Sequence, residues 1–420
     1  MSTKPLRIGM FSESFHPVQN GVTTSVRTLI GELRKLGHHV WVFAPEHHDQ
    51  PAHETNVVRF PSFVTQFNPE YPLVYPFLPR IRLASQIERL KLDVIHTHSP
   101  FVLGLTGADL AIRRGIALVS TFHTLYNEYS HYVSFLPESF TQGILEAYLP
   151  WYYNRCAIVT APSQVAADHL AKTGVDRPIE VVPTGIPIPD PESIDARKQD
   201  SVRDRLGVAS GQAMLLYAGR LAPEKQIGWL IDTFACILDR APDAILAIAG
   251  GGPMADELAD HARATGVARS VRFLGPVPRA EMDPIYAAAD VFVFPSPSET
   301  QGLVIGEARA AGTPAVVVDA GGGPETVRDG IDGFRVPEGD KAAFASRVLE
   351  LLNNRELLAQ VSARARETAR DQSPERMSQR MLEIYERARQ IGATADSGAA
   401  EITVDADESW EAAMEPHGES

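Results

Sequence analysis

The chain has 420 residues, which is long for one domain and favours two. Apolar residues make up 44% of it and the mean hydropathy is −0.11, values typical of a globular protein with a large core. The formal net charge of −14 argues against general nucleic-acid binding, and no apolar run approaches the roughly 20 residues of a membrane-spanning helix.

Targeting and redox signals are sparse. The N-terminus enters an apolar strand within a few residues, which leaves no room for a signal peptide. Cys156 and Cys236 lie far apart in apolar contexts and are interpreted as buried free thiols. These features predict a cytoplasmic protein.

The first half of the chain alternates short β-rich runs with helical patterns. A strand at 6–11 precedes a helix at 22–36, which Gly37 ends as a glycine at the C′ position. Further strands are predicted at 39–44, 94–96, 117–121, 157–160 and 180–182. Strands that alternate with helices imply a mostly parallel sheet covered on both faces.

Four prolines in nine residues, from Pro183 to Pro191, interrupt this pattern and are interpreted as a stiff inter-domain connection. The second half then repeats the same alternation. Strands are predicted at 214–218, 245–249, 271–274, 291–294 and 315–318, and helices at 341–352, 356–370 and 375–390. The sequence therefore predicts a domain at 1–186, a linker at 187–205, a second domain at 206–372 and a last helix at 373–391.

The C-terminal stretch 392–420 carries eight acidic residues and no Lys or Arg. A segment of this composition cannot bury enough apolar surface to offset the cost of ordering, so it is predicted to be a disordered tail. Asp405 and Asp407 within it have the spacing of a metal-binding pair, but we assign no site there.

The strongest local signal lies between 295 and 307. An apolar strand ends at Pro295, a loop follows, and a helix begins near Leu303. Gly302 and Leu303 therefore offer backbone N–H groups at a helix N-terminus, which suits a diphosphate. Glu299 precedes the helix and Glu307 lies one turn into it, where carboxylates can accept hydrogen bonds from hydroxyl groups.

Three other strand-to-helix turns carry weaker signals. Arg220 and Lys225 flank the turn after the strand at 214–218 and offer two cations to a phosphate. The glycines at 250–252 and the Asn20–Gly21 turn would let backbone approach a ligand closely.

Histidines mark two strand ends of the first half. His123 ends the run 119–123, at the end of the strand predicted at 117–121, and is predicted to face a cleft between the domains. His96 and His98 have a spacing that aims both at one face of a strand. Because no third ligand is apparent, packing or acceptor contacts are favoured over a metal site, and no metal is predicted.

These motifs together resemble the retaining GT-B glycosyltransferases of the "glycosyl transferases group 1" family. The resemblance covers roughly residues 6–391. It is carried by Glu299-x7-Glu307, by Gly219-Arg220-x4-Lys225 and by the Asn20–Gly21–Val22 loop. His123 and Pro183–Thr184–Gly185 also fall where that family has its functional histidine and its interdomain turn. The family's N-terminal Gly-Gly pair is Asn20–Gly21 here.

The resemblance implies an α/β fold of the GT-B class, with two Rossmann-like domains that face each other across a cleft and a C-terminal crossover helix. It implies an enzyme that uses a nucleotide sugar as substrate and needs no cofactor. The implied catalytic residues are His123, Arg220, Lys225 and Glu299. The implied donor-binding residues are Gly21, Arg220, Lys225, Gly302, Leu303 and Glu307.

The acceptor is expected on the N-terminal domain. The aromatic stretch around Tyr126, Tyr129 and His131 looks like the diacylglycerol glucosyltransferases of the family, and these three are the predicted acceptor-binding residues. Aromatic and basic residues interleave between 60 and 91, a composition that suits an anionic membrane surface. The expected reaction is hexose transfer from UDP-glucose to a lipid such as diacylglycerol, at the inner face of the cytoplasmic membrane.

Three alternatives stay open at this stage. The first is transfer from GDP-mannose or another donor to a soluble polyol or sugar phosphate. The second is a nucleotide-sugar epimerase on the same two-domain plan. The third, an NAD-dependent oxidoreductase, lacks a Gly-x-Gly-x-x-Gly fingerprint.

Overall fold

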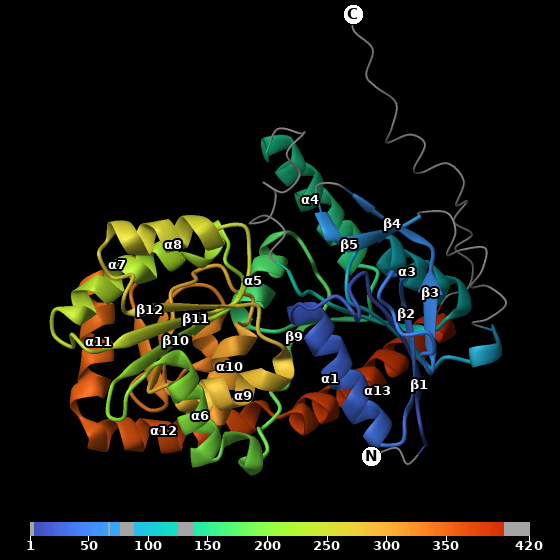
Figure 1. Cartoon of the computed structure of the whole chain (residues 1–420). Coiled ribbons are helices and arrows are strands. Elements are labelled where there is room, and N and C mark those ends of the chain that lie inside the picture. The colour runs from blue at the N-terminus through green and yellow to red at the C-terminus, as the bar shows by residue number, and fades with distance from the viewer. Residues whose placement is uncertain (1–3, 66–67, 76–87, 125–137, 399–420) are drawn as a thin grey trace, which may run out of the picture.

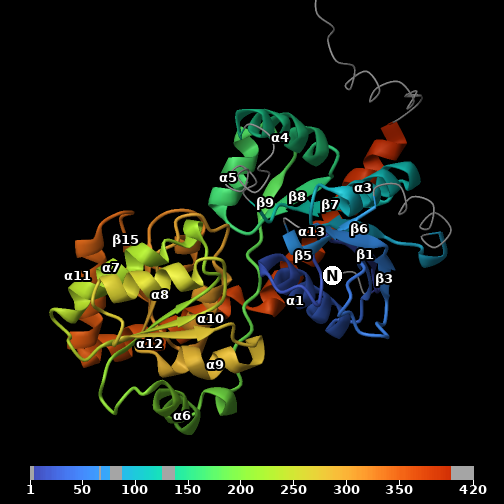
Figure 2. The ribbon, with the colours of Figure 1, turned by 45° about the horizontal axis from the view of Figure 1, so that its top comes forward.

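A computed structural model describes residues 4–65, 68–75, 88–124 and 138–398 of the chain. Two parallel sheets lie next to each other, and each is covered by helices (Figure 1). The view in Figure 2 shows the same two bodies, joined by the irregular segment after β9 and by the last helix. The predicted fold class, two Rossmann-like α/β halves, is confirmed.

The N-terminal sheet has seven strands in the order β3-β2-β1-β6-β7-β8-β9, all parallel. Its central strands are buried on both faces, and polar side chains in them, such as His96 and Ser120, are hydrogen-bonded to neighbouring strands. The strands are β1 (Arg7–Phe11), β2 (His39–Pro45), β3 (Val57–Phe60), β6 (Val94–Thr97), β7 (Ala117–Thr121), β8 (Ile158–Ala161) and β9 (Ile179–Val181). The helices are α1 (Gly21–Lys35), α3 (Val102–Arg114), α4 (Glu138–Tyr153) and α5 (Gln164–Lys172), and β4 (Ser62–Thr65) pairs with β5 (Asn68–Val74) in an antiparallel hairpin.

The C-terminal sheet has six parallel strands in the order β12-β11-β10-β13-β14-β15. The strands are β10 (Met214–Ala218), β11 (Ile245–Ala249), β12 (Val271–Gly275), β13 (Val291–Phe294), β14 (Ala315–Val318) and β15 (Gly333–Val336). The α-helices are α6 (Ala196–Leu206), α7 (Ile227–Leu238), α8 (Ala255–Ala264), α9 (Arg279–Ala288), α10 (Leu303–Ala311), α11 (Lys341–Asn353) and α12 (Arg355–Ala369). Short 3₁₀ turns are η2 (Pro191–Ile194), η3 (Pro223–Lys225), η4 (Gly323–Thr326) and η5 (Arg370–Gln372).

The last helix, α13 (Pro374–Gly398), returns to the N-terminal domain and packs against α1 and β7. Met381, Ile384 and Tyr385 are buried there in the N-terminal core. The two segments that pass between the domains touch: the N–H of Ile186 donates to the carbonyl oxygen of Gln372 at 2.7 Å. The predicted crossover helix is confirmed.

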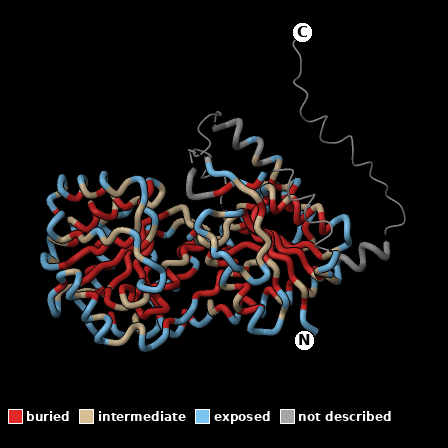
Figure 3. The backbone as a smooth tube through the Cα atoms, turned by 45° about the vertical axis from the view of Figure 1, so that its right-hand side comes forward, coloured by how far each residue is buried: buried red, intermediate tan, exposed pale blue. Residues whose placement is uncertain are grey.

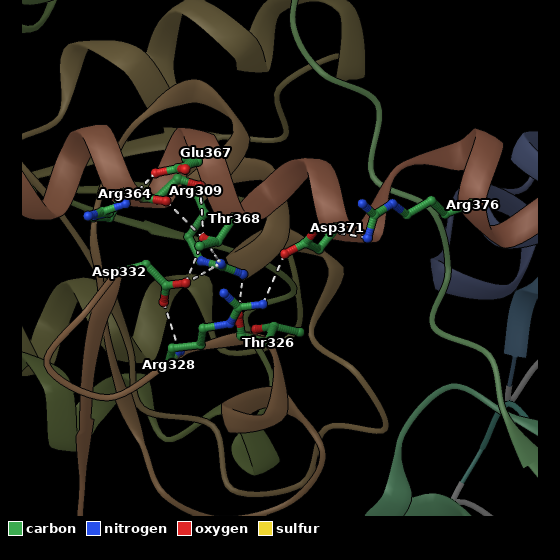
Figure 4. A network of polar contacts seen from close by, with 10 residues as sticks. Arg309, Thr326, Arg328, Asp332, Arg364, Glu367, Thr368, Asp371 and Arg376 are labelled. Atoms are coloured by element: carbon green, nitrogen blue, oxygen red, sulfur yellow. Dashed lines mark hydrogen bonds and ion pairs between the residues drawn. The ribbon is translucent and has the colours of Figure 1, made fainter.

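A polar network ties the C-terminal domain to the start of this crossing (Figure 4). Arg309 on α10 and Asp332 form a buried ion pair at 2.6 Å, and both contact the hydroxyl of Thr368 on α12. At the rim, Asp371 pairs with Arg328 and Arg376. The network therefore links α10 to the segment where the chain leaves the domain.

Several details differ from the sequence expectation. The stretch predicted as a linker contains most of α6, and Val202 of that helix is buried in the C-terminal core. Cys156 is buried as predicted, whereas Cys236 is exposed, because it lies on the outward face of α7. Buried residues are concentrated in the interior of the two sheets and on the helix faces that cover them (Figure 3). The predicted domain boundaries stay our proposal.

Candidate active site between the two domains

The N-terminus of α10 is an open helix end. Gly302 precedes it with φ +70°, a left-handed conformation that favours glycine, and a Cβ there would lie 2.8 Å from Cδ1 of Ile305. No side chain within the described residues caps this end. The first turn of α10 therefore begins without a side-chain cap, and ligand binding by Gly302 and Leu303 stays a prediction.

A second helix N-terminus meets it from the other domain. Asn20 caps α1, where its side-chain oxygen accepts from the N–H of Thr23 at 2.8 Å. A Cβ on Gly21 would lie 3.8 Å from Cδ1 of Leu303. Since both helices present their positive ends, the structure brings together a region suited to an anionic group.

The two basic candidates lie on the turn after β10. Lys225 ends η3, and its Nζ is 2.6 Å from Oε1 of Glu299. Arg220 is exposed on the same turn, and its carbonyl oxygen accepts from the hydroxyl of Tyr217 at 3.3 Å. Lys225 therefore fixes the carboxylate of Glu299 beside the open end of α10, a pairing that the sequence analysis did not predict.

The glycine-rich turn after β11 has a packing role. A Cβ on Gly250 would lie 1.8 Å from the carbonyl oxygen of Gly219, and one on Gly252 would lie 2.3 Å from that of Leu221. The backbone of this turn therefore packs against the turn that carries Arg220 and Lys225.

Glu307 is held inside the C-terminal domain. Its Oε2 accepts from the hydroxyl of Tyr286 at 2.9 Å, and its Oε1 lies 3.2 Å from Nε of Arg279. Burial raises the pKa of this carboxyl, while Arg279 and Tyr286 act in the opposite direction. Tyr286 and Arg279 therefore orient Glu307. The sequence analysis did not predict the role of Arg279, because this residue lies on α9, outside the motifs that carry the resemblance.

The histidines of the N-terminal domain form one cluster. Nδ1 of His98 is 3.0 Å from Nε2 of His123, and the rings of His96 and His98 are 4.1 Å apart. His96 contacts the hydroxyls of Tyr385 at 2.8 Å and Thr121 at 2.7 Å. Acceptor contacts and packing, as favoured by the sequence, therefore describe His96 and His98.

This cluster lines a small cavity of about 20 Å³, large enough for about one water molecule. Ser25, Thr184 and Met377 also line it. Burial lowers the pKa of His123 to about 4 and that of His96 to about 3, so both rings are neutral at pH 7.

Two contacts across the domains were not predicted. The side chain of Gln301, next to Gly302, accepts from the N–H of Thr184 at 2.9 Å and donates to its carbonyl oxygen at 3.1 Å. The carboxylate of Glu325 accepts from the N–H groups of Gln164 and Val165 at the start of α5, both at 2.7 Å. These partners lie more than one hundred residues apart in the sequence.

Another carboxylate, Glu13, lies at the end of β1. Its Oε1 accepts from the N–H of Leu103, in the first turn of α3, at 2.6 Å. Burial raises the pKa of Glu13 to about 7 despite this backbone bond. Sequence reasoning passed over it because a single acidic residue after a strand has no distinctive pattern.

Apolar side chains are exposed on the same domain. Phe63 on β4 and Tyr75 after β5 are 39% and 45% exposed, with their rings 4.9 Å apart. Trp151 on α4 is 49% exposed and lies beneath the guanidinium of Arg155. The predicted acceptor residues Tyr126, Tyr129 and His131 lie outside the described residues.

Among the described residues, His47, His48 and Asp49 are close enough to share a metal ion, on consecutive positions after β2. No helix in the described part of the chain is long and apolar enough to cross a membrane.

Comparisons with known proteins agree with this arrangement. Residues 198–368 match the family model "Glycosyl transferases group 1", and residues 19–188 match "Glycosyltransferase Family 4". The chain is 32% identical over 318 residues to an alpha-monoglucosyldiacylglycerol synthase of Streptococcus pneumoniae, covering 74% of this chain and 70% of that protein. The chain belongs to the glycosyl transferases group 1 family.

A second relative of this glycosyltransferase is a phosphatidyl-myo-inositol mannosyltransferase of Mycobacterium leprae. It is 29% identical, over 91% of this chain and 96% of that protein. The structure resembles that of Anabaena HepE in complex with UDP, with a TM-score of 0.72 over 91% of this chain and 100% of that one. The sequence identity to HepE is 21%, so this likeness concerns the fold, and it confirms the predicted GT-B class.

Proposed function

We propose that the enzyme transfers glucose from UDP-glucose, with retention of the anomeric configuration, to a lipid such as diacylglycerol. The transfer takes place at an anionic membrane surface, which we propose to be the inner face of the cytoplasmic membrane. Membership of the family favours transfer over the epimerase alternative.

The observation that carries the proposal is the meeting of two helix N-termini. Gly21 and Leu303 place the positive ends of α1 and α10 close together between the domains. The ion pair of Lys225 with Glu299 lies on the turns next to α10. A diphosphate bound there would gain charge-assisted hydrogen bonds from both domains.

The chemistry follows from where charge develops. As the bond between the anomeric carbon and the diphosphate oxygen breaks, its electron pair leaves with the diphosphate. Arg220, Lys225 and the N–H groups at Gly302 and Leu303 stabilise that charge. The acceptor hydroxyl attacks from the face that the diphosphate leaves, and a phosphate oxygen takes its proton.

The other candidates serve the two sugars of the donor. In this proposal Glu307 binds the ribose, with its orientation set by Tyr286 and Arg279. Glu299 binds hydroxyls of the transferring glucose, and His123 contacts this sugar from the N-terminal domain. Tyr126, Tyr129 and His131 contact the acceptor.

The lipid acceptor is supported by two observations. Both relatives described above carry a lipid in their names, a diacylglycerol in one and a phosphatidylinositol in the other. The hairpin that bears Phe63 and Tyr75 exposes apolar rings on the domain expected to bind the acceptor. Exposed aromatic rings of this kind suit insertion between lipid headgroups.

A donor panel tests the function. UDP-glucose, UDP-galactose, UDP-N-acetylglucosamine and GDP-mannose are each incubated with the enzyme, with and without diacylglycerol in anionic vesicles, and nucleotide release is followed. Release from UDP-glucose that requires the vesicles supports the proposal. Vesicle-independent release contradicts the lipid acceptor, and preference for another nucleotide sugar contradicts the donor.

Vesicle co-sedimentation tests the membrane surface separately. Phe63→Ser combined with Tyr75→Ser should weaken binding to anionic vesicles, while nucleotide binding is kept. Ile112→Ser is a matched control, because Ile112 is also exposed but lies on α3. Equal binding by all three proteins would remove the hairpin from the membrane contact.

A further inference from the structure

His98 connects two residues on neighbouring strands of the N-terminal sheet. It follows β6, which lies between β1 with Met10 and β7, the strand that precedes His123. Nε2 of His98 is 3.3 Å from Sδ of Met10, and Nδ1 of His98 is 3.0 Å from Nε2 of His123. His98 is buried, so its ring nitrogens have only these partners to satisfy them within the described part of the chain.

The chemistry of the two partners decides where the protons lie. A thioether sulfur can only accept a hydrogen bond, so Nε2 of His98 carries its proton toward Met10. Burial keeps the His98 ring neutral, since it holds the pKa well below its usual range. Nδ1 of His98 is therefore unprotonated and accepts, which requires Nε2 of His123 to donate.

The same reasoning fixes the other side of His123. Its pKa is lowered to about 4 by burial, so at pH 7 the ring carries one proton. That proton is on Nε2, which leaves a lone pair on Nδ1. Within the described residues, Nδ1 of His123 has no hydrogen-bond partner.

We propose that His98, supported by Met10, is a positioning residue that fixes His123 in the neutral tautomer with Nδ1 as a hydrogen-bond acceptor for a hydroxyl of the transferring sugar. The choice of ligand rests on the proposed function, in which His123 contacts that sugar. The tautomer itself rests on the contacts of His98 alone.

An acceptor is the useful state of the ring in glycosyl transfer. The reacting sugar develops positive charge as the bond to the diphosphate breaks. A neutral nitrogen that accepts from a sugar hydroxyl favours this charge, whereas an imidazolium would oppose it. The described residues that line the cavity beside His123 include no Asp, Glu, Lys or Arg. Among them His96 is also neutral, and it contacts the hydroxyls of Tyr385 on α13 and Thr121 on β7.

Nitrogen NMR of the full-length enzyme labelled at histidine tests the tautomer without any substrate. The chain has 13 histidines, and the resonances of His123 are assigned from their loss in His123→Phe. At pH 7 we expect a pyridine-like Nδ1 and a pyrrole-like Nε2 at His123. The reverse pattern, or two protonated nitrogens, would overturn the proposal.

Two substitutions at His98 test its role. His98→Phe keeps a ring but removes the acceptor, so the tautomer signature of His123 should be lost and kcat should fall by about 10- to 100-fold, as for other residues that orient a functional histidine. His98→Asn keeps an acceptor at the position of Nδ1 and should restore both the signature and kcat to within about tenfold of wild type. Met10→Leu, which replaces the thioether by a hydrocarbon side chain of similar volume, should let the second tautomer appear.

These readouts separate the inference from the proposed function. Should every donor in the panel be silent while the expected tautomer is present and depends on His98, the function is wrong and the positioning role stands. If the wild-type enzyme is active but His98→Phe keeps its kcat and its tautomer, the positioning role is wrong and the function stands.

Discussion

At the scale of single residues, Lys225 has the clearest expected effect. Its ammonium lies 2.6 Å from Glu299 and beside the open end of α10, where the leaving diphosphate would gain charge. Lys225→Ala should lower kcat by about 10²–10³, equivalent to about 2.7–4 kcal/mol, in a steady-state assay with the donor that the panel identifies.

Lys341→Ala is the matched control for that measurement. It also breaks a lysine–carboxylate pair of the C-terminal domain, in which Nζ of Lys341 lies 2.7 Å from Asp232 on α7. Its kcat should equal that of the wild type, and thermal melts should show both variants folded. A near-wild-type kcat for Lys225→Ala would remove Lys225 from the mechanism.

The buried histidines predict a pH dependence of stability. The pKa of His96 is about 3 in the folded protein, below the value of about 6.5 in an unfolded chain. Unfolding therefore takes up a proton between these values, and the free energy of unfolding falls as the pH falls from about 6.5 toward 3. His96 contributes about 1.4 kcal/mol per pH unit to this slope.

Urea unfolding at several pH values from 7 to 5 measures the slope. His96→Gln keeps a neutral polar group that cannot take up a proton, so the slope should be smaller by about 1.4 kcal/mol per pH unit. Identical slopes in wild type and His96→Gln would contradict a neutral buried His96.

At the scale of helices and strands, the sequence predicted most elements but few of their contacts. The all-apolar runs β10, β11, β13 and β14 were predicted to the residue, because strands buried on both faces leave an unbroken apolar signal. β15 was missed, since an edge strand that contains a glycine and an exposed arginine has no such signal.

In the candidate site too, the sequence predicted local features but not the contacts between distant residues. Gly302, Leu303 and Lys225 could be predicted, because a strand, a turn and a helix start follow one another locally in the sequence. The pairs that complete the site could not be. Gln301 with Thr184 joins the two domains, and Lys225 with Glu299 joins two turns that follow the neighbouring strands β10 and β13 of one sheet. No periodicity in the sequence records such a pairing.

The network in Figure 4 holds α10 against α12. Asp332 is fully buried with Arg309, and its other oxygen accepts from the N–H of Arg328 at 2.8 Å. Asp332→Ala would leave a buried guanidinium without its carboxylate, and should lower the free energy of unfolding by about 3–5 kcal/mol in urea titrations.

Asp371→Ala provides the comparison within the same network. Asp371 pairs with Arg328 and Arg376 near the surface, so its loss should cost about 1 kcal/mol or less. Equal losses for the two variants would mean that burial does not decide the strength of these pairs.

At the scale of the whole molecule, Glu325 spans the two domains. It lies on η4 of the C-terminal domain, and its carboxylate accepts two N–H groups at the start of α5 in the N-terminal domain. The N–H of Gly322, which precedes η4, also donates to the carbonyl oxygen of Glu299 at 2.6 Å. The loop that carries Glu299 is therefore joined through Gly322 and Glu325 to the opposite domain.

Glu325→Ala should shift the molecule toward more open arrangements of its domains. Two charge-assisted hydrogen bonds on an exposed side chain correspond to about a tenfold change in such an equilibrium. The amides of Gln164 and Val165 should exchange with solvent faster in hydrogen–deuterium exchange. The amide of Ala166, which bonds to Ser163 of its own domain, should keep its rate and serves as an internal reference.

Glu257→Ala, an exposed glutamate in the first turn of α8, is the control for surface charge. It should leave both the exchange rates and the donor KM unchanged, whereas Glu325→Ala should raise the donor KM by about tenfold. If the amides at the start of α5 exchange equally fast in wild type and Glu325→Ala, the carboxylate does not hold the domains together in solution. If they exchange faster while the donor KM is unchanged, the contact exists but donor binding does not depend on it.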